Sequence, residues 1–98
     1  MNRFPEIRNW AEERNLIKGS NPQAQMLKTM EELGEVAAGV ARDNQSAIID
    51  GIGDVVVCLT ILAAQRDIPI EACIEYAWDQ IKDRKGRMVD GVFIKSGD

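Results

Sequence analysis

Three glutamates lie within five positions of one another in the stretch KTMEELGEVAAG, residues 28–39. On a helix these carboxylates would share neighbouring turns, where like charges repel and weaken the helix. Such a group either faces water or surrounds something positive. Two aspartates, Asp50 and Asp54, follow one turn apart at the start of the next apolar stretch. Asp54 lies on the same side of the predicted helix as Val57 and Ile61. We therefore expect it to begin a buried face, where an unpaired carboxylate is costly.

A purely structural role explains these aspartates only in part. Negative charge in the first turn of a helix is favoured by the helix dipole, which accounts for Asp50 but not for Asp54, two turns in. The chain has no histidine, which removes the commonest general base and the commonest zinc ligand. If acids from two helices converge, hard oxygen ligands of this kind favour Mg²⁺ or Mn²⁺, and magnesium typically serves phosphate chemistry.

Composition limits the remaining possibilities. The 98 residues predict a single domain spanning 1–98, small enough to gain stability by oligomerising. The formal net charge is -4, with 16 acidic against 12 basic residues, which argues against a general nucleic-acid binder. Cys58 and Cys73 lie in apolar stretches without the spacing of a metal site or a disulfide framework, so buried thiols in a reducing cytoplasm are the better interpretation. The amino terminus lacks the apolar region of a signal peptide, and the apolar run 55–64 is about half the length of a membrane span, so we expect a cytoplasmic protein without a membrane partner.

Turn and capping residues divide the chain into helices. Asn21-Pro22 is typical of a helix start, residues 42–46 form a polar break, and Gly86 follows a basic turn as at many helix ends. These signals predict four helical segments, at residues 4–15, 22–42, 46–66 and 69–85. The tail after residue 87 carries an Asp-Gly turn signal and predicts a short extended piece or an arm laid on a partner. We therefore expect an all-α four-helix bundle with a short C-terminal tail.

Hydrophobic patterning predicts which helix faces are buried. The second segment has one apolar stripe with Lys28 and the three glutamates on the far side, so an amphipathic helix with an acidic solvent face would explain it by itself. That stripe consists of Met26, Met30, Leu33, Ala37, Val40 and Ala41. The third segment is apolar all round, which predicts a buried helix at the centre of the bundle.

The two acidic segments resemble a known family. Glu-Glu-Leu-Gly-Glu at 31–35 and Asp-Gly-Ile-Gly-Asp-Val-Val-Val at 50–57 resemble the EExxE and ExxD patterns of MazG-like, all-α nucleoside triphosphate pyrophosphohydrolases. The lead-in at 21–28 and the closing Ile-Lys-Asp-Arg-Lys-Gly-Arg-Met at 81–88 extend the resemblance over most of the chain. EExxE alone is a weak signal because glutamate-rich helices are common, whereas its combination with the spaced acids is fairly specific.

The resemblance implies an activity and a set of site residues. Proteins of this family are helical, assemble as homodimers or dimers of dimers, and hydrolyse nucleoside or deoxynucleoside triphosphates to the monophosphate and pyrophosphate with Mg²⁺. Position by position, the metal ligands would be Glu31, Glu32, Glu35 and Asp54, with Mn²⁺ as a possible substitute. The family glutamate three residues before this aspartate is replaced by Gly51, and Asp50 lies one position earlier, about 100° away around the helix, which makes Asp50 the least secure ligand.

The implied chemistry also assigns roles to other side chains. A metal-activated water would attack the α-phosphorus, with Glu32 or Glu35 taking its proton. Lys28, Lys82, Arg84 and Lys85 would face phosphate oxygens, although the last three also suit the C-terminus of a helix. Trp10, Tyr76 and Trp78 would stack on a base or, more in keeping with aromatic residues of small proteins, fill the core.

Two other functions remain open at this point. The chain could be a non-catalytic, metal-stabilised helical oligomer of the same fold, with Gly51 marking a lost site. It could also be an antitoxin-like or regulatory bundle whose acidic face mimics a polyanion. Magnesium-dependent release of pyrophosphate would separate the enzyme from both.

Overall fold

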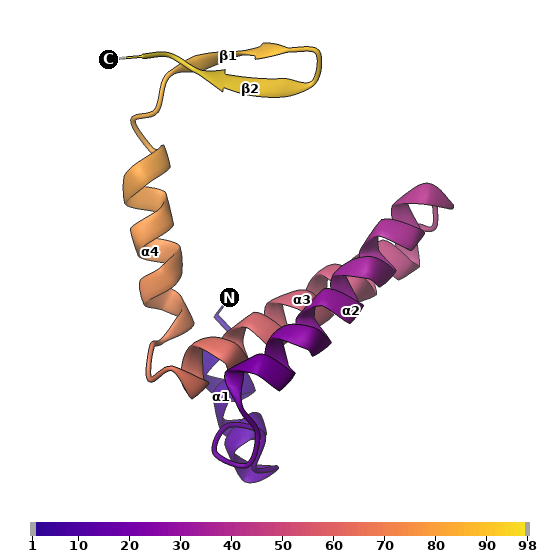
Figure 1. Cartoon of the computed structure of the whole chain (residues 1–98), viewed down its shortest axis with the longest axis vertical. Helices are drawn as coiled ribbons and strands as arrows, with labels where there is room; N and C mark the ends of the chain where they lie inside the picture. Colours follow the sequence, from indigo (N-terminus) through magenta and orange to yellow (C-terminus); the bar gives the residue numbers. More distant parts are fainter. Residues whose placement is uncertain (1, 98) are drawn as a thin grey trace.

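The computed structural model describes residues 2–97 and consists of four helices followed by a β-hairpin (Figure 1). In chain order the elements are α1 (Phe4–Glu13), α2 (Pro22–Ala41), α3 (Gln45–Gln65), α4 (Ile70–Ile81), β1 (Gly86–Val89) and β2 (Val92–Lys95). The predicted all-α architecture with four helices is confirmed, and the first three helices have the predicted bounds to within about two residues.

Local side-chain chemistry sets the helix boundaries. Asn21 caps α2 by accepting a hydrogen bond from the Ala24 amide at 2.8 Å, and Asn44 caps α3 in the same way. The first three helices end at residues with positive φ, and each of these ends has the backbone bond of a Schellman motif. The three residues are Asn15, Asp43 and Asp67. The connection between α2 and α3 is therefore limited to residues 42–44.

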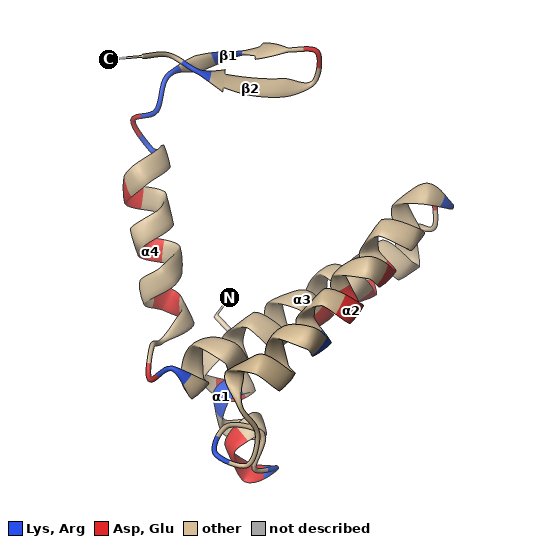
Figure 2. Cartoon of the chain, in the orientation of Figure 1, with Lys and Arg blue, Asp and Glu red and all other residues tan. Residues whose placement is uncertain are grey.

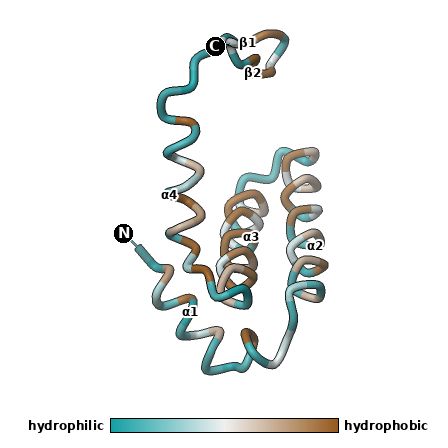
Figure 3. Tube along the Cα trace, turned by 60° about the vertical axis from the view of Figure 1, so that its left-hand side comes forward, coloured by the Kyte–Doolittle hydropathy of each residue, from teal (hydrophilic) through white to brown (hydrophobic). Residues whose placement is uncertain are grey.

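Helices α2 and α3 form an antiparallel pair that carries most of the tertiary contacts (Figures 1 and 3). Two glycines allow the helices to approach closely, because a Cβ at Gly51 would lie 2.7 Å from Val36 Cγ2 and one at Gly39 would lie 3.3 Å from Ile48 Cγ1. The buried amide of Gln25 also donates to the Cys58 carbonyl oxygen at 3.2 Å. The face of α2 turned toward α3 therefore includes a glycine and polar residues beside Val36.

This packing corrects the predicted orientation of α2. The side chains that face α3 are offset by one position from the apolar stripe, and they include the buried residues Gln25, Thr29 and Glu32. The predicted apolar stripe exists but points outward, with Met30 55% exposed and Val40 61% exposed. Likewise α3 buries Cys58 and Ile61 but leaves Ile52 half exposed. An isolated chain thus leaves uncovered the surfaces expected to form its core.

Helix α1 lies across α3, where Ala11 is fully buried. The loop after α1 is tied to α3 by the Gln65 side-chain amide, which donates to the Leu16 carbonyl oxygen at 3.0 Å. Arg8 pairs with Glu71 at the start of α4 through two hydrogen bonds of 2.6 and 3.1 Å. This ion pair links the first helix to the last.

The C-terminal third of the chain departs from the predicted bundle. Helix α4 ends at Ile81 instead of residue 85, and Gly86 begins a hairpin whose Asp90–Gly91 turn has positive φ at both residues. Gly86 pairs with Lys95 in the sheet, and glycine is needed there because a Cβ would collide with the Ile94 carbonyl oxygen. Figure 1 shows α4 and the hairpin leaning away from the α2–α3 pair. The prediction of an extended tail is confirmed. The prediction that α4 continues through a basic last turn to residue 85 was wrong.

The overall dimensions reflect this open arrangement. The radius of gyration is 16.1 Å, against about 13 Å for a compact domain of this length. The expected aromatic core residues Trp10, Tyr76 and Trp78 are 44%, 69% and 54% exposed. Cys58 is buried as expected, whereas Cys73 is exposed, which corrects its interpretation as a buried thiol.

Helix α3 has the length and composition to cross a membrane, with a mean hydropathy of 2.1 over its most apolar window. The core helix of a soluble protein passes the same test. The expected absence of a membrane partner stays a prediction.

Candidate functional site

The three glutamates of α2 lie close together in the structure. Each of Glu31, Glu32 and Glu35 offers a carboxylate oxygen, and these oxygens all lie within 4.8 Å of one another. Glu31 and Glu35 are exposed, whereas Glu32 is only 8% exposed because it lies on the face of α2 that packs against α3. Figure 2 shows this acidic patch midway along the α2–α3 pair. Of the two interpretations of these glutamates, an acidic face turned only to solvent therefore does not hold for Glu32.

Glu32 is the centre of the site. Its Oε1 pairs with Lys28 Nζ at 3.1 Å, and the same ammonium lies 3.7 Å from Glu31 Oε1. Its Oε2 is buried and has no hydrogen-bond partner among the described residues. A buried carboxylate oxygen without a partner is costly, and a bound cation would satisfy it.

The electrostatics of the neighbouring acids support this interpretation. The pKa of Glu35 is raised, chiefly by the charge of Glu32 and then by desolvation. Partial burial raises the pKa of Asp54, and the charges of Asp50 and Glu32 add to the shift. Asp54 on α3 is thus close enough to Glu32 on α2 for the two carboxylates to repel each other. Acids from two helices converge, as the sequence predicted.

Asp50 has a different position from the other acids. It is exposed and lies outside the group of three glutamates, and its charge acts on Asp54. The neighbouring Gly51 is buried against Val36, so a side chain at that position would collide with α2. Helix packing therefore explains the glycine where the family pattern has glutamate.

The donor set fits a divalent cation. The ligand atoms of Glu31, Glu32, Glu35 and Asp54 are carboxylate oxygens, which are the ligands that Mg²⁺ and Mn²⁺ prefer. The unpartnered oxygen of Glu32 lies within the cluster, and Glu35 and Asp54 flank it on two helices. A cation at this place would relieve the repulsion that raises the pKa of both flanking acids.

An open cavity of about 580 Å³ adjoins the acids. Its walls come from α1 and α3 and consist of Arg3, Glu6, Ile7, Trp10, Asp54 and Val57. One face of the Trp10 ring is covered by the Arg14 guanidinium, 4.5 Å from the ring centroid. The sequence does not predict this cavity, because no pattern in it places α1 beside Asp54.

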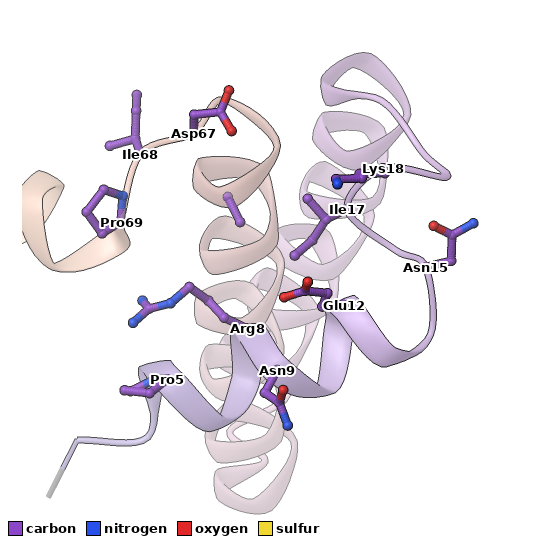
Figure 4. Close-up of a pocket in the computed structure, with 11 residues that line it drawn as sticks. Pro5, Arg8, Asn9, Glu12, Asn15, Ile17, Lys18, Asp67, Ile68 and Pro69 are labelled. Carbon is purple, nitrogen blue, oxygen red and sulfur yellow. The ribbon is translucent and has the colours of Figure 1, made fainter.

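A second hollow of about 560 Å³ lies between α1, the loop after it and the α3–α4 connection. Figure 4 shows that its walls include Arg8, Glu12 and Lys18, with Pro69 on the opposite side. None of its lining residues belongs to the acidic group, so it has no direct part in the chemistry of these carboxylates.

The predicted phosphate-binding residues fall into two places. Lys28 lies at the acidic group, in contact with Glu31 and Glu32. Lys82, Arg84 and Lys85 follow the end of α4, and Figure 2 shows this basic connection well away from the acidic patch of the same chain. A single chain does not bring these three residues to the acids.

Comparison with known proteins identifies relatives. The family model described as "MazG nucleotide pyrophosphohydrolase domain" matches residues 20–89. The chain is 50% identical over 62 residues to an uncharacterized 18.2 kDa protein from the rep–hol intergenic region of Haemophilus phage HP1 (strain HP1c1). That match covers 63% of this chain and 38% of the phage protein, so the chain spans well under half of its relative. No solved structure matched the chain.

Proposed function

Because the chain belongs to the family of MazG nucleotide pyrophosphohydrolase domains, we propose that it hydrolyses nucleoside or deoxynucleoside triphosphates to the monophosphate and pyrophosphate in a Mg²⁺-dependent reaction. The observation that carries this proposal is the buried Glu32 oxygen without a partner, flanked by other acids. An acidic helix face meant only for water would not bury its central carboxylate.

The side chains present define the roles in the reaction. Glu31, Glu32, Glu35 and Asp54 hold the metal, and Asp50 contributes charge near Asp54. The bound Mg²⁺ would neutralise phosphate charge and lower the pKa of the attacking water. Mn²⁺ offers the same preference for oxygen ligands and would substitute for it.

Exposure distinguishes the two glutamates proposed to take a proton. Glu32 is buried and paired with Lys28, whereas the Glu35 carboxylate is exposed to solvent. We assign the proton of the attacking water to Glu35 for this reason. Lys28, whose pKa is raised chiefly by its hydrogen bond to Glu32, stays charged and would offer its remaining N–H donors to a phosphate oxygen.

The cavity beside Asp54 offers space for the nucleoside. A volume of about 580 Å³ is in the ordinary range of small-molecule sites. Ile7, Trp10 and Val57 provide apolar walls for a base, and Asp54 connects this space to the acids. The triphosphate would extend from the cavity toward Glu32.

The outward apolar stripes support a homo-oligomer. Met30 and Val40 on α2 and Ile52 on α3 are each more than half exposed in the single chain. Contiguous apolar surface of this kind marks an interface in soluble proteins. We propose a homodimer, with a dimer of dimers as the next assembly, in which these stripes are covered.

The test is a panel of purified nucleoside and deoxynucleoside triphosphates incubated with the protein in Mg²⁺ or Mn²⁺. We expect release of pyrophosphate rather than orthophosphate, and its loss with chelator. Glu35→Gln should abolish turnover while the helical circular dichroism is unchanged, and Glu13→Gln, an exposed change on α1, should retain full activity. No release with any nucleotide would favour a non-catalytic or regulatory oligomer.

A further inference from the structure

Helix α1 separates the two cavities of the molecule and gives a different face to each. Its residues at positions 5, 8, 9 and 12 line the hollow of Figure 4. The cavity beside Asp54 is lined instead by positions that recur at threes and fours on the other face, which are Arg3, Glu6, Ile7 and Trp10. The proposed function uses the apolar side chains of Ile7 and Trp10 and leaves the charged side chains of Arg3 and Glu6 without a role.

Arg3 and Glu6 form a group of hydrogen-bond donors and acceptors at the wall of this cavity. Arg3 Nη1 donates to both carboxylate oxygens of Glu6, at 3.0 and 2.9 Å. The two side chains are 61% and 64% exposed, so the other N–H groups of the guanidinium and the remaining lone pairs of the carboxylate have room for a ligand. The pair therefore offers one edge with donors at Arg3 and two acceptors at Glu6.

The stability of α1 does not explain this pair. Negative charge suits the first turn of a helix, which accounts for Glu6. Arg3, however, is the N-cap residue, where positive charge is unfavourable, and its side chain makes no capping hydrogen bond. An exposed ion pair at this spacing also contributes little to stability. A ligand in the adjoining cavity would account for both residues.

The base whose edge fits this pair is guanine. Guanine presents the O6 carbonyl beside two neighbouring donors, N1–H and the 2-amino group. O6 would accept a hydrogen bond from Arg3, and the two donors would meet the two carboxylate oxygens of Glu6. Adenine and cytosine carry one amino donor next to an acceptor, and uracil and thymine carry one N–H between two carbonyls. None of these bases supplies a donor to both carboxylate oxygens.

The pair also lies where the edge of a stacked base would be. Arg14 covers one face of the Trp10 ring and leaves the other face for a base. Glu6 lies one turn before Trp10, about 6 Å along the helix axis, with Ile7 on the same face. Asp54 lines the same cavity and connects it to the acids of α2. A base against Ile7 and Trp10 can therefore present its edge to the pair while its phosphates extend toward Asp54.

We propose that Arg3 and Glu6 determine the base specificity of the site and that the preferred substrate is a guanine nucleoside or deoxynucleoside triphosphate. This inference rests on the proposed function for the reaction, whereas binding of guanine in the cavity does not require turnover. The expected preference for guanine over each other base is about 5- to 150-fold in kcat/KM, the range for one two-point contact with a base edge.

Turnover of matched nucleotides tests this specificity. The kcat/KM is measured for guanosine, inosine, adenosine, cytidine and uridine triphosphates and for the corresponding deoxynucleotides. Inosine triphosphate lacks only the 2-amino group of guanine, so it isolates one contact with Glu6 and should fall between guanosine and adenosine triphosphates. Glu6→Gln replaces an acceptor by a donor and should lower guanosine triphosphate to about the level of inosine triphosphate.

A matched control has the same change on the other face of α1. Glu12→Gln lies at the hollow of Figure 4 and should keep the preference for guanine. Equal kcat/KM for all bases in the wild-type protein, or an unchanged preference in Glu6→Gln, overturns the proposal.

A binding measurement separates failure of this proposal from failure of the proposed function. Trp78→Phe, outside the lining of the cavity, leaves Trp10 as the single tryptophan. Quenching of its fluorescence by guanosine, inosine and adenosine monophosphates gives dissociation constants without metal and without turnover. Tighter binding of guanosine monophosphate that is lost in Glu6→Gln supports the proposal even when no triphosphate is hydrolysed. Equal binding of the three monophosphates, or no binding, contradicts it while hydrolysis of triphosphates still decides the proposed function.

Exchange of the two charged residues tests a purely structural role. Arg3→Glu/Glu6→Arg keeps an ion pair at the same spacing but reverses the donors and acceptors along the edge. We expect this variant to lose the preference for guanine with unchanged helical circular dichroism. A retained preference would show that the pair acts by supporting α1 and does not contact the base.

Discussion

At the scale of single residues, Glu32 decides the interpretation of the site. The acids around it are exposed or half-buried and would tolerate water, but Glu32 is buried with one oxygen paired to Lys28 and the other without a partner. Removing its charge should therefore affect metal binding more than folding.

We expect Glu32→Gln to abolish the stabilisation of the protein by Mg²⁺. A metal present at 100 times its dissociation constant stabilises a folded protein by about 2.7 kcal/mol, and most of this gain should disappear with the ligand. Thermal unfolding with and without Mg²⁺ measures the effect. Glu13→Gln is the matched control, and an unchanged Mg²⁺ effect in Glu32→Gln would remove Glu32 from the ligand set.

A change at Trp10 should distinguish binding of the nucleoside from binding of the phosphates. Trp10→Ala removes the largest apolar wall of the cavity beside Asp54, and loss of base stacking costs about 1–3 kcal/mol. We expect a KM for nucleoside triphosphates that is raised at least about fivefold, with the inhibition constant of inorganic triphosphate, used as a competitor without a base, unchanged. Equal effects on both constants would show that Trp10 supports the fold and does not bind the base.

The stability of the metal-free protein should depend on pH in a stated direction. The pKa values of Glu35 and Asp54 are raised in the folded chain, so the folded state binds more protons than the unfolded state as pH rises above the ordinary values of 4.5 and 3.8. Stability is therefore lost as pH rises through the raised values. Glu71, whose pKa is lowered by its hydrogen bond to Arg8, has the opposite effect on stability. Its contribution to the stability of the folded chain is fully present above pH 4.5 and is lost as the pH falls through the lowered pKa. We expect the melting temperature without metal to fall from pH 4.5 toward neutrality, less steeply in Glu35→Gln, and Mg²⁺ to restore it at neutral pH.

At the scale of elements, the close approach of α2 and α3 positions the acids. Gly51 and Gly39 let the two backbones come together, and this contact turns Glu32 toward Asp54. The site thus depends on helix packing at positions that carry no functional group.

Two glycines on α3 provide a matched test of this packing. Gly53→Ala has nothing within 4 Å of its new Cβ and should stabilise the helix by up to about 1 kcal/mol. Gly51→Ala meets Val36 at 2.7 Å, and such overpacking costs about 1–3 kcal/mol. Urea unfolding should show changes of opposite sign in the free energy of unfolding of the two variants. Adding Val36→Ala to Gly51→Ala should recover part of the lost stability. A stabilised Gly51→Ala would mean that the helices are farther apart than described.

The elements also show what sequence reasoning can and cannot predict. Local signals predicted the helix starts at Asn21 and Asn44 and the Asp90–Gly91 turn, because capping and turn chemistry act over a few residues. The pattern of acids predicted that Asp54 would meet the glutamates of α2. Periodicity did not predict which face of α2 packs on α3, because the two stripes differ by one position and the small residues that allow close packing carry little hydrophobic signal. The end of α4 was missed because hairpin pairing overrides the helical tendency of residues 82–85.

At the scale of the whole molecule, many large apolar side chains of the described residues are exposed in the single chain. Met26 on α2 is 42% exposed and belongs to the outward stripe. We expect Met26→Glu to fold as a monomer with a lower melting temperature, because the charge opposes burial between copies. Light scattering and melting at several protein concentrations measure both effects, with Gln45→Glu as an exposed control. If Met26→Glu leaves the assembly intact, the stripe of α2 is not the interface.

The outward apolar stripes of α2 and α3 have a kinetic consequence. If a chain is active only when these stripes are covered by a second copy, a newly made chain is inert until it meets another. At low dosage the total activity would then grow with the square of the amount of protein, and the specific activity in proportion to it, until every chain is paired. Expression level would act as a threshold on hydrolysis of the nucleotide pool, without any added inhibitor.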